Sequence, residues 1–384
     1  MAAVGIMFVA ANLRPAVVAV APLVDDIKAS TGWSNSVTGL LTTLPVLVFG
    51  LAAPVAPRLA ARFGIERTVF GSLALLVAAT ALRLMPSPVA LFAGSALIGA
   101  GIGICNVVLP SLIKRDFAHR SGLMTGFYSM TLSGGAAAAA ALTVPINHAV
   151  GGDWRMALAS WGMFALAAML VWLPQLRRVH RMELRTERVS LWRNRIAWAI
   201  TVFMGTQSII FFTFAAWLPA YLIDRGMSPS GAGAVLALGQ VVGLVASLIA
   251  PIIAGRFRDQ RVITGLVLLV CAVGFAGLVG TEVWPTFWVM CVFVGPGASI
   301  SLALLFMVLR GSSTAQTSQI SGMAQSVGYI LAAVGPFAIG GLHDVTGSWA
   351  IAMTAVALML IPQAISTAVA AKNVTIEPKS LRQN

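Results

Sequence analysis

Long apolar runs separated by short polar segments repeat along almost the whole chain. A helix needs roughly 20 apolar residues to cross a bilayer, and we place twelve such runs in the 384 residues. The predicted spans are residues 3–24, 35–57, 68–85, 89–112, 121–147, 154–174, 196–222, 230–254, 262–281, 284–309, 319–342 and 348–371. Their connections are short and marked by proline or glycine, as at Pro86–Pro88. The pattern predicts an all-α membrane protein with twelve transmembrane helices.

The longest connection divides these spans into six and six. Residues 175–195 form a charged linker rich in arginine. We therefore predict an N-terminal six-helix bundle at residues 1–174, a basic cytoplasmic linker at 175–195, and a C-terminal six-helix bundle with a short cytoplasmic tail at 196–384.

Short motifs recur in the two halves in the same order, at separations of 194 to 200 residues. The pairs are Ser36-Val-Thr-Gly39 with Ser230-Gly-Ala-Gly233, Pro57 with Pro251, Gly99-Ala-Gly101 with Gly295-Pro-Gly297, and Ser121-Gly-Leu-Met124 with Ser321-Gly-Met-Ala324. These matches predict two pseudo-symmetric bundles that arose by duplication. Parallel repeats of six helices are typical of the major facilitator architecture, in which the substrate site lies near the membrane midplane between the repeats.

The composition and the placement of charge support a membrane location. The chain is 58% apolar and only 10% charged, whereas soluble domains carry about 25% charged residues. The net charge of +13 would suggest nucleic acid in a soluble protein. Here, however, twenty of the 25 Lys and Arg fall in loops after even-numbered spans or in the C-tail, and four fall in the opposite loops. This asymmetry predicts cytoplasmic termini by the positive-inside rule, a lipid bilayer as the partner, and no nucleic acid.

Several motifs resemble those of known transporters. Leu59-Ala-Ala-Arg-Phe-Gly-Ile-Glu-Arg67 is similar to the signature between spans 2 and 3 of major facilitator transporters, although Ala61 stands where an aspartate is usual. Asn12-Leu-Arg-Pro15, Asn106-Val-Val-Leu-Pro110, Trp217-Leu-Pro219 and Ser321-Gly-Met-Ala-Gln-Ser-Val-Gly-Tyr329 resemble the bacterial cyanate and 2-nitroimidazole transporter family. The resemblance implies transport of a small anionic or polar nitrogen-containing solute across the bacterial inner membrane.

Arg14 is the one charged residue that we place in the middle of a predicted span. It lies about 11 residues, roughly 16 Å, from the start of its span and so near the midplane. An arginine at that depth costs roughly 2.5–3.5 kcal/mol and remains a cation. No acidic residue lies inside a predicted span, so we expect Arg14 to bind the negative end of a substrate. A structural alternative is a hydrogen bond to a carbonyl group that Pro15 frees near residue 11.

Polar side chains in other spans complete the candidate substrate site. They are Asn12, Asn106, Tyr128, Gln207, Trp217, Gln240, Gln325 and Tyr329. Gln207 is adjacent to Ser208, the residue that duplicates Arg14 at a separation of 194. Gln325 and Tyr329 share one helical face. Helix packing is the alternative role for Asn12 and Asn106, and an interfacial anchor or a gate is the alternative for Trp217.

The sequence offers no chemistry for an enzyme. No phosphate-binding loop, nucleophile motif or metal-ligand cluster is present, so we expect no catalytic residue, metal or cofactor. All twelve carboxylates fall in loops or at span ends, which provides no proton relay inside the membrane. A coupling proton would have to use Asp25 or Asp26, or travel with the substrate.

The sequence therefore predicts a monomeric secondary transporter of the major facilitator fold that works by alternating access on a small-molecule substrate. A multidrug-type exporter of small apolar compounds is one alternative, although such a site would favour acidic and aromatic residues. A channel or a non-transporting membrane sensor is another, and the duplicated bundles disfavour both.

Overall fold

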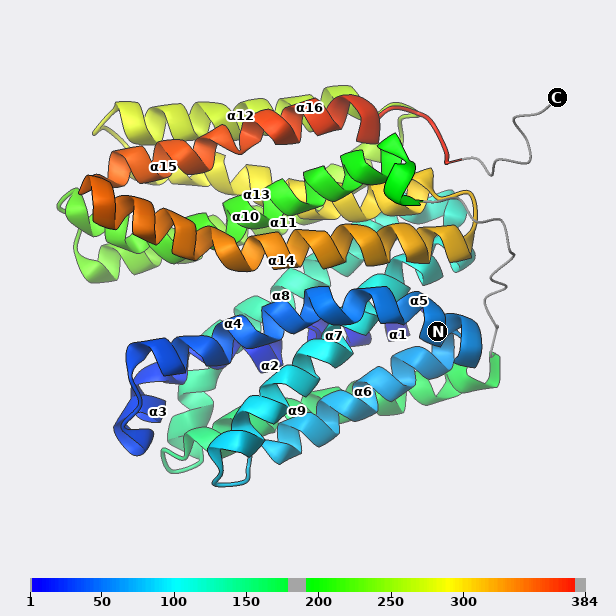
Figure 1. Cartoon of the computed structure of the whole chain (residues 1–384), viewed down its shortest axis with the longest axis horizontal. Helices are drawn as coiled ribbons and strands as arrows, with labels where there is room; N and C mark the ends of the chain where they lie inside the picture. The colour runs from blue at the N-terminus through cyan, green and yellow to red at the C-terminus, as the bar shows by residue number, and fades with distance from the viewer. Residues whose placement is uncertain (1, 179–190, 377–384) are drawn as a thin grey trace. The chain divides into compact units, whose positions relative to one another are not determined.

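A computed structural model describes residues 2–178 and 191–376. This part of the chain is almost entirely helical, and twelve of its helical segments are long and apolar enough to cross a membrane. The predicted fold class and number of spans are thereby confirmed (Figure 1). Most of the predicted linker, and the tail from residue 377, lie outside the described residues.

The chain divides into two compact units, which we describe separately. The first consists of Met1–Leu112 and Met130–Arg185, and the second of Ile113–Ser129 and Thr186–Asn384. The helices in the first half of the chain are α1 (Ala2–Asn12), α2 (Pro15–Val18), η1 (Ala21–Leu23), α3 (Val24–Thr31), α4 (Asn35–Ala52), η2 (Ala53–Val55), α5 (Ala56–Phe63), α6 (Ile65–Leu82), α7 (Pro88–Asp116), η3 (Ala118–Arg120), α8 (Ser121–Ala149), α9 (Trp154–Trp172) and η4 (Leu173–Arg178). Those in the second half are η5 (Leu191–Arg193), α10 (Arg195–Asp224), α11 (Pro229–Ala254), α12 (Arg261–Gly280), α13 (Pro285–Arg310), α14 (Thr314–Thr346), α15 (Trp349–Leu358) and α16 (Leu360–Ala370).

Local sequence signals set several helix ends. The side chains of Asp153, Asn194, Ser228 and Ser313 each accept a hydrogen bond from a backbone N–H in the first turn of the helix that follows, as N-cap residues do. Gly347 ends α14 with a positive φ of 63°, a conformation that glycine adopts without a steric penalty. Short polar connections therefore suffice to separate consecutive spans.

Glycine contacts repeat between the two halves at a separation of 194 residues, which pairs Gly297 with Gly103 and corrects the sequence match of Gly297 with Gly101. A Cβ added to Gly103 would lie 2.7 Å from the carbonyl oxygen of Phe49, and one added to Gly297 would overlap the backbone of Gly243. Residues 103 and 297 differ by 194, as do residues 49 and 243. The α4–α7 pair of the first half and the α11–α13 pair of the second therefore cross at equivalent points, which is independent support for duplication.

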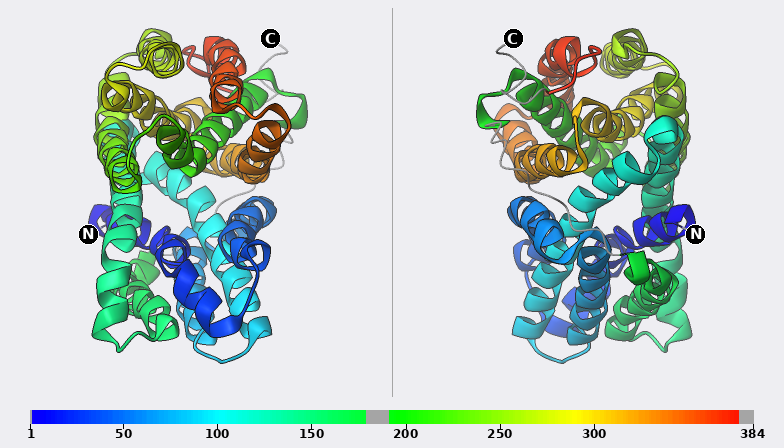
Figure 2. Two further views of the ribbon diagram at one scale, coloured as in Figure 1. Left: turned by 90° about the vertical axis from the view of Figure 1, so that its left-hand side faces the viewer. Right: turned by 90° about the vertical axis from the view of Figure 1, so that its right-hand side faces the viewer.

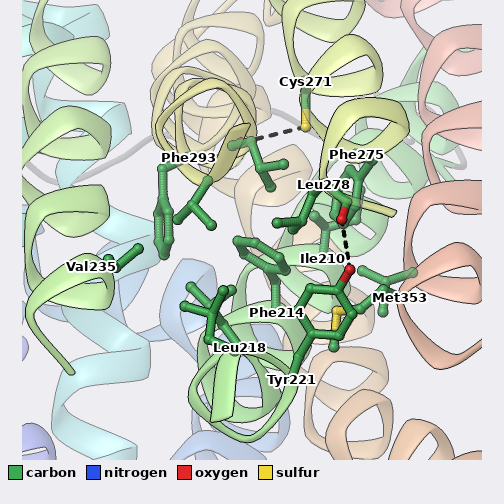
Figure 3. Close-up of a cluster of buried hydrophobic side chains, with 14 of the residues drawn as sticks. Ile210, Phe214, Leu218, Tyr221, Val235, Cys271, Phe275, Leu278, Phe293 and Met353 are labelled. Atoms are coloured by element: carbon green, nitrogen blue, oxygen red, sulfur yellow. Dashed lines mark hydrogen bonds between the residues drawn. The ribbon is translucent and has the colours of Figure 1, made fainter. Parts of the chain in front are cut away.

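Aromatic packing fills the interior of the second unit. The ring of Phe214 on α10 lies 5.2 Å from that of Phe275 and 5.4 Å from that of Phe293. The hydroxyl of Tyr221 donates a 2.6 Å hydrogen bond to the carbonyl oxygen of Leu278 (Figure 3). α10, α12 and α13 are thus packed around one apolar core.

An apolar groove of about 690 Å³ lies between α12 and the α15–α16 pair, which run side by side in Figures 1 and 2. Leu269, Ala276, Leu358 and Ile361 are among its lining residues, and none of the predicted site residues contributes to it. This lining offers few hydrogen-bond partners to a polar solute, so the groove does not fit the substrate predicted from the sequence.

The structure corrects the assignment of two arginines to solvent-facing loops. The side chains of Arg83 and Arg310 are only 1% and 2% exposed. Arg310 ends α13 and donates hydrogen bonds to the carbonyl oxygens of Ala370 at 2.9 Å and Ala371 at 3.0 Å, and to the amide oxygen of Gln260. The sequence could not show this, because the acceptors lie 50 to 61 residues away.

Replacing Arg310 by methionine should therefore destabilise the second unit without affecting substrate binding. The change removes the donor from the carbonyl oxygen of Ala370 and the amide oxygen of Gln260, whereas the carbonyl of Ala371 keeps a hydrogen bond from the backbone N–H of Gln260. Each buried oxygen left without a donor costs about 1–3 kcal/mol. Thermal unfolding of the purified protein in detergent measures the loss. Arg258→Met, at an exposed position two residues before Gln260, is the matched control and should leave the melting temperature unchanged. Equal melting temperatures for the two variants would contradict this role for Arg310.

Candidate functional site

The first span is not one continuous helix, and its interruption falls at Arg14. α1 ends at Asn12 and the four-residue helix α2 begins at Pro15. Between them Arg14 has φ −121° and ψ −36°, away from regular helical values. Its side chain is half-buried. Proline cannot donate the hydrogen bond that residue 11 would otherwise accept, so the predicted span 3–24 is broken at this point.

A close contact with α8 faces this interruption. A Cβ added to Gly135 would overlap the carbonyl oxygen of Ala11, the carbonyl that Pro15 leaves without its helical donor. Only a glycine allows α8 to approach the backbone of the first span so closely. The position of Gly135 against the interruption is a finding of the structure.

A second interruption follows one turn later. The backbone N–H of Val20 bonds to Val17 at 3.4 Å rather than to Ala16, and the 3-10 helix η1 with Pro22 comes next. The carbonyl oxygen of Ala16 instead accepts a 2.7 Å hydrogen bond from Nη1 of Arg83. Arg83 thus bonds to the interrupted segment close to Arg14, although its place at a span end had led us to count it among the loop charges.

The two asparagines predicted for the site are both buried in the first unit. Asn12 uses its side-chain amide to donate a 2.8 Å hydrogen bond to the carbonyl oxygen of Phe8 in its own helix. Asn106 lies in α7, four residues before Pro110, which removes the helical donor for the carbonyl of Asn106. Polar residues one turn before a proline therefore occur in both α1 and α7.

In the second unit, α10 and α14 bring three predicted residues close to one helix crossing. A Cβ added to Gly328 would lie 3.5 Å from the Cα of Gly205. Gln207 follows that crossing on α10, while Gln325 and Tyr329 flank it on α14, and all three are buried. Gln207 donates to Ser208 Oγ at 2.7 Å, and Gln325 donates to Ser321 Oγ at 2.7 Å. The structure thus places these residues within one helical turn of the Gly205–Gly328 contact along their helices.

The other predicted residues of the second unit are more dispersed. Trp217 donates from Nε1 to the carbonyl oxygen of Pro336 at 2.8 Å and packs 5.2 Å from the ring of Trp349, so its indole joins α10 to α14. Tyr128 is buried on α8, and Gln240 is half-buried on α11. No group of His, Cys, Asp or Glu within residues 2–178 and 191–376 could hold a metal ion.

Comparison with known proteins identifies the family. The model of the Major Facilitator Superfamily matches residues 3–336. The chain belongs to this superfamily. It is a multi-pass membrane transporter and not an enzyme, as the sequence predicted.

Two relatives and one solved structure are particularly similar. The 2-nitroimidazole transporter of Escherichia coli (strain K12) is 42% identical over 366 residues, which are 94% of this chain and 93% of the relative. The cyanate transport protein CynX of the same organism is 32% identical, over 93% of this chain and 94% of its own length. The proton:xylose symporter XylE, solved with 6-bromo-6-deoxy-D-glucose, has a TM-score of 0.75 at 13% identity over 100% and 98% of the two chains.

The two relatives confirm that, within the superfamily, this chain belongs to the cyanate and 2-nitroimidazole transporter family. The likeness to XylE at 13% identity shows the fold alone. As a member of the superfamily, the protein is a secondary transporter that binds a small-molecule substrate.

Proposed function

We propose that the protein transports a small solute that is anionic or carries a polar nitrogen heterocycle, and that Arg14 binds its electron-rich end. The observation that carries the proposal is the interruption of the first span at Arg14. Discontinuous spans form the substrate sites of many transporters, because unwound backbone and its flanking side chains can face a ligand at membrane depth. Arg14 supplies a permanent positive charge at that place.

Neutral hydrogen-bonding groups complete the proposed site. Gln207, Gln325 and Tyr329 flank the α10–α14 crossing, and Asn106 lies in α7. A single cation with neutral amides and hydroxyls suits a monovalent anion or a polar heterocycle better than a divalent anion, which would leave one charge uncompensated. Cyanate and 2-nitroimidazole, named in the two relatives, both meet this description. Asn12, Tyr128, Gln240 and Trp217 belong to the proposed site as weaker contributors.

Transport by alternating access follows from the duplicated design. We propose two bundles, residues 1–174 and 196–384, that belong to a monomer in the bacterial inner membrane with both termini in the cytoplasm. The basic residues of the loops after even-numbered spans support this orientation.

Uptake by purified protein in proteoliposomes tests the proposal. We expect saturable uptake of radiolabelled 2-nitroimidazole or cyanate, with competition by other small anions and polar heterocycles. Imposing a pH gradient in the same vesicles shows whether a proton is coupled to transport. Empty vesicles are the control.

Other outcomes would separate the alternatives. Competition by apolar or cationic drugs, but not by small anions, would indicate a multidrug-type exporter. Ligand binding without flux would indicate a sensor, and conductance that does not saturate would indicate a channel. Each of these results would contradict the proposed function.

A further inference from the structure

Arg83 follows the last residue of α6 and lies completely inside the first unit. Its Nη1 donates to the carbonyl oxygen of Ala16 at 2.7 Å, and its Nη2 donates to Ser95 Oγ at 2.9 Å. The Ser95 hydroxyl in turn donates to the carbonyl oxygen of Leu91 at 2.7 Å. The guanidinium therefore joins the first span to α7 through neutral oxygen atoms.

The acceptor in the first span is a carbonyl that its own helix does not satisfy. The N–H of Val20, which a regular helix would direct to Ala16, bonds to Val17 instead. A buried carbonyl without a donor costs about 1–3 kcal/mol. Nη1 of Arg83 meets this need at a position only two residues beyond Arg14, and α2 with its two flanking interruptions is thereby held in one place.

The neighbouring residues of α7 leave space for the Arg83 side chain. A Cβ added to Gly94 of α7 would lie 3.0 Å from Cγ of Arg83 and 2.7 Å from the carbonyl oxygen of Ala79. Gly94 thus leaves room for the arginine stem, and the adjacent Ser95 accepts its hydrogen bond. Nε of Arg83 has no hydrogen-bond partner among the described residues. Burying an arginine that has only neutral hydrogen-bond acceptors costs folding free energy. An apolar side chain at this position would therefore stabilise the protein more.

In the second half of the chain, the equivalent contact between two helices contains no arginine. At the separation of 194, Arg83 corresponds to Gly277 and Gly94 corresponds to Trp288. There a Cβ added to Gly277 would overlap the indole of Trp288, so an aromatic ring on the partner helix fills the space. The corresponding span, α10, is a continuous helix of 30 residues with Ile209 in place of Pro15. The arginine therefore occurs in the half whose first span is interrupted.

We propose that Arg83 is a positioning residue for substrate binding: by clamping the Ala16 carbonyl to Ser95 of α7, it fixes the interrupted first span so that Arg14 is presented to the solute. This inference rests on the proposed function for the role of Arg14. The clamp itself can be tested without any substrate.

The first test measures backbone mobility by hydrogen–deuterium exchange of the full chain in detergent. Arg83→Met should raise exchange several-fold in peptides that cover residues 13–24. Arg310→Met removes another buried arginine that donates to carbonyl groups, but it lies in the second unit, and it should leave those peptides unchanged. Unchanged exchange in Arg83→Met would overturn the clamp. If that variant does not fold, Ser95→Ala removes the hydroxyl that accepts from Arg83 and donates to Leu91 within α7, and it should produce a smaller increase in the same peptides.

The second test measures binding of radiolabelled 2-nitroimidazole. Arg83→Met should weaken binding roughly tenfold, as the loss of a well-placed charged hydrogen bond does. Arg83→Lys should recover part of the affinity, since one ammonium can donate to Ala16 but cannot copy the two-pronged contact. In the Arg14→Lys background, Arg83→Met should cost little more, because coupled residues are not additive.

Together, the two tests distinguish a failure of the positioning role of Arg83 from a failure of the proposed function. Fully additive losses, or an Arg83→Met variant that binds like the wild type, would overturn the positioning role. Absence of saturable binding by the wild-type protein would contradict the proposed function instead, and the exchange measurement would still decide whether Arg83 clamps the first span.

Discussion

Replacing Arg14 by alanine should weaken substrate binding by on the order of 100-fold, because truncating one member of a desolvated charge pair costs 2–5 kcal/mol and each 1.4 kcal/mol is tenfold. Uptake in proteoliposomes should fall to the level of empty vesicles. Thermal unfolding of the variant in detergent shows whether it remains folded. Radiolabelled 2-nitroimidazole and cyanate are the probes for both binding and uptake.

Replacing Arg14 by lysine shows how much of the binding depends on the positive charge and how much on the shape of the guanidinium group. Arg14→Lys keeps the positive charge but lacks the planar fork of guanidinium donors, and it should retain part of the binding. Arg58→Ala, which removes an exposed arginine of α5, is the control and should bind like the wild type. If Arg14→Ala binds and transports normally, the assignment of Arg14 to the site is wrong and the structural alternative gains support.

Gly135→Ala should both destabilise the protein and impair binding. The new methyl group would overlap the carbonyl oxygen of Ala11, a rigid backbone atom, so α8 and the first span must move apart. Overpacking of this kind typically costs 1–3 kcal/mol. Because Ala11 lies three residues before Arg14, the displacement should also shift the proposed site, and affinity for 2-nitroimidazole should fall at least roughly tenfold.

The same chemical change elsewhere provides the control. Gly71 lies in α6 with no atom within 4 Å of an added Cβ, and Gly71→Ala should be neutral or stabilising by up to about 1 kcal/mol, since alanine favours the helix. Thermal unfolding and binding are measured for both variants. Equal behaviour of Gly135→Ala and Gly71→Ala would show that the contact with Ala11 is not tight enough to matter.

Much of the architecture could be predicted because it depends on residues that are close together in the sequence. Hydrophobic length alone identified twelve spans, and the recurring motifs predicted duplication, although the structure matches Gly297 with Gly103 and not with Gly101 as the motifs suggested. Pro15 beside Arg14 pointed to a freed carbonyl group near residue 11 as one alternative, since a proline removes a donor wherever it stands in a helix.

The candidate site was only partly predictable. The sequence suggested Gln207, Gln325 and Tyr329 separately, but their positions close to the Gly205–Gly328 contact depend on how α10 packs on α14. For Asn12 the structure shows a hydrogen bond back to Phe8, a choice of partner that no spacing rule fixes because a buried amide can bond within its helix or across helices.

The sequence by itself determined the membrane class, the count of spans, the duplication and the cation near the middle of the first span, because hydropathy, charge and proline act on residues close in the chain. Only the tertiary structure decided that Arg83 is buried and bonded to a carbonyl 67 residues away, that Gly135 faces the carbonyl of Ala11, and that Arg310 joins α13 to the end of α16. A charge at a span end can face water or turn inward, and the choice depends on whether distant backbone groups lack donors there, which a linear pattern does not record.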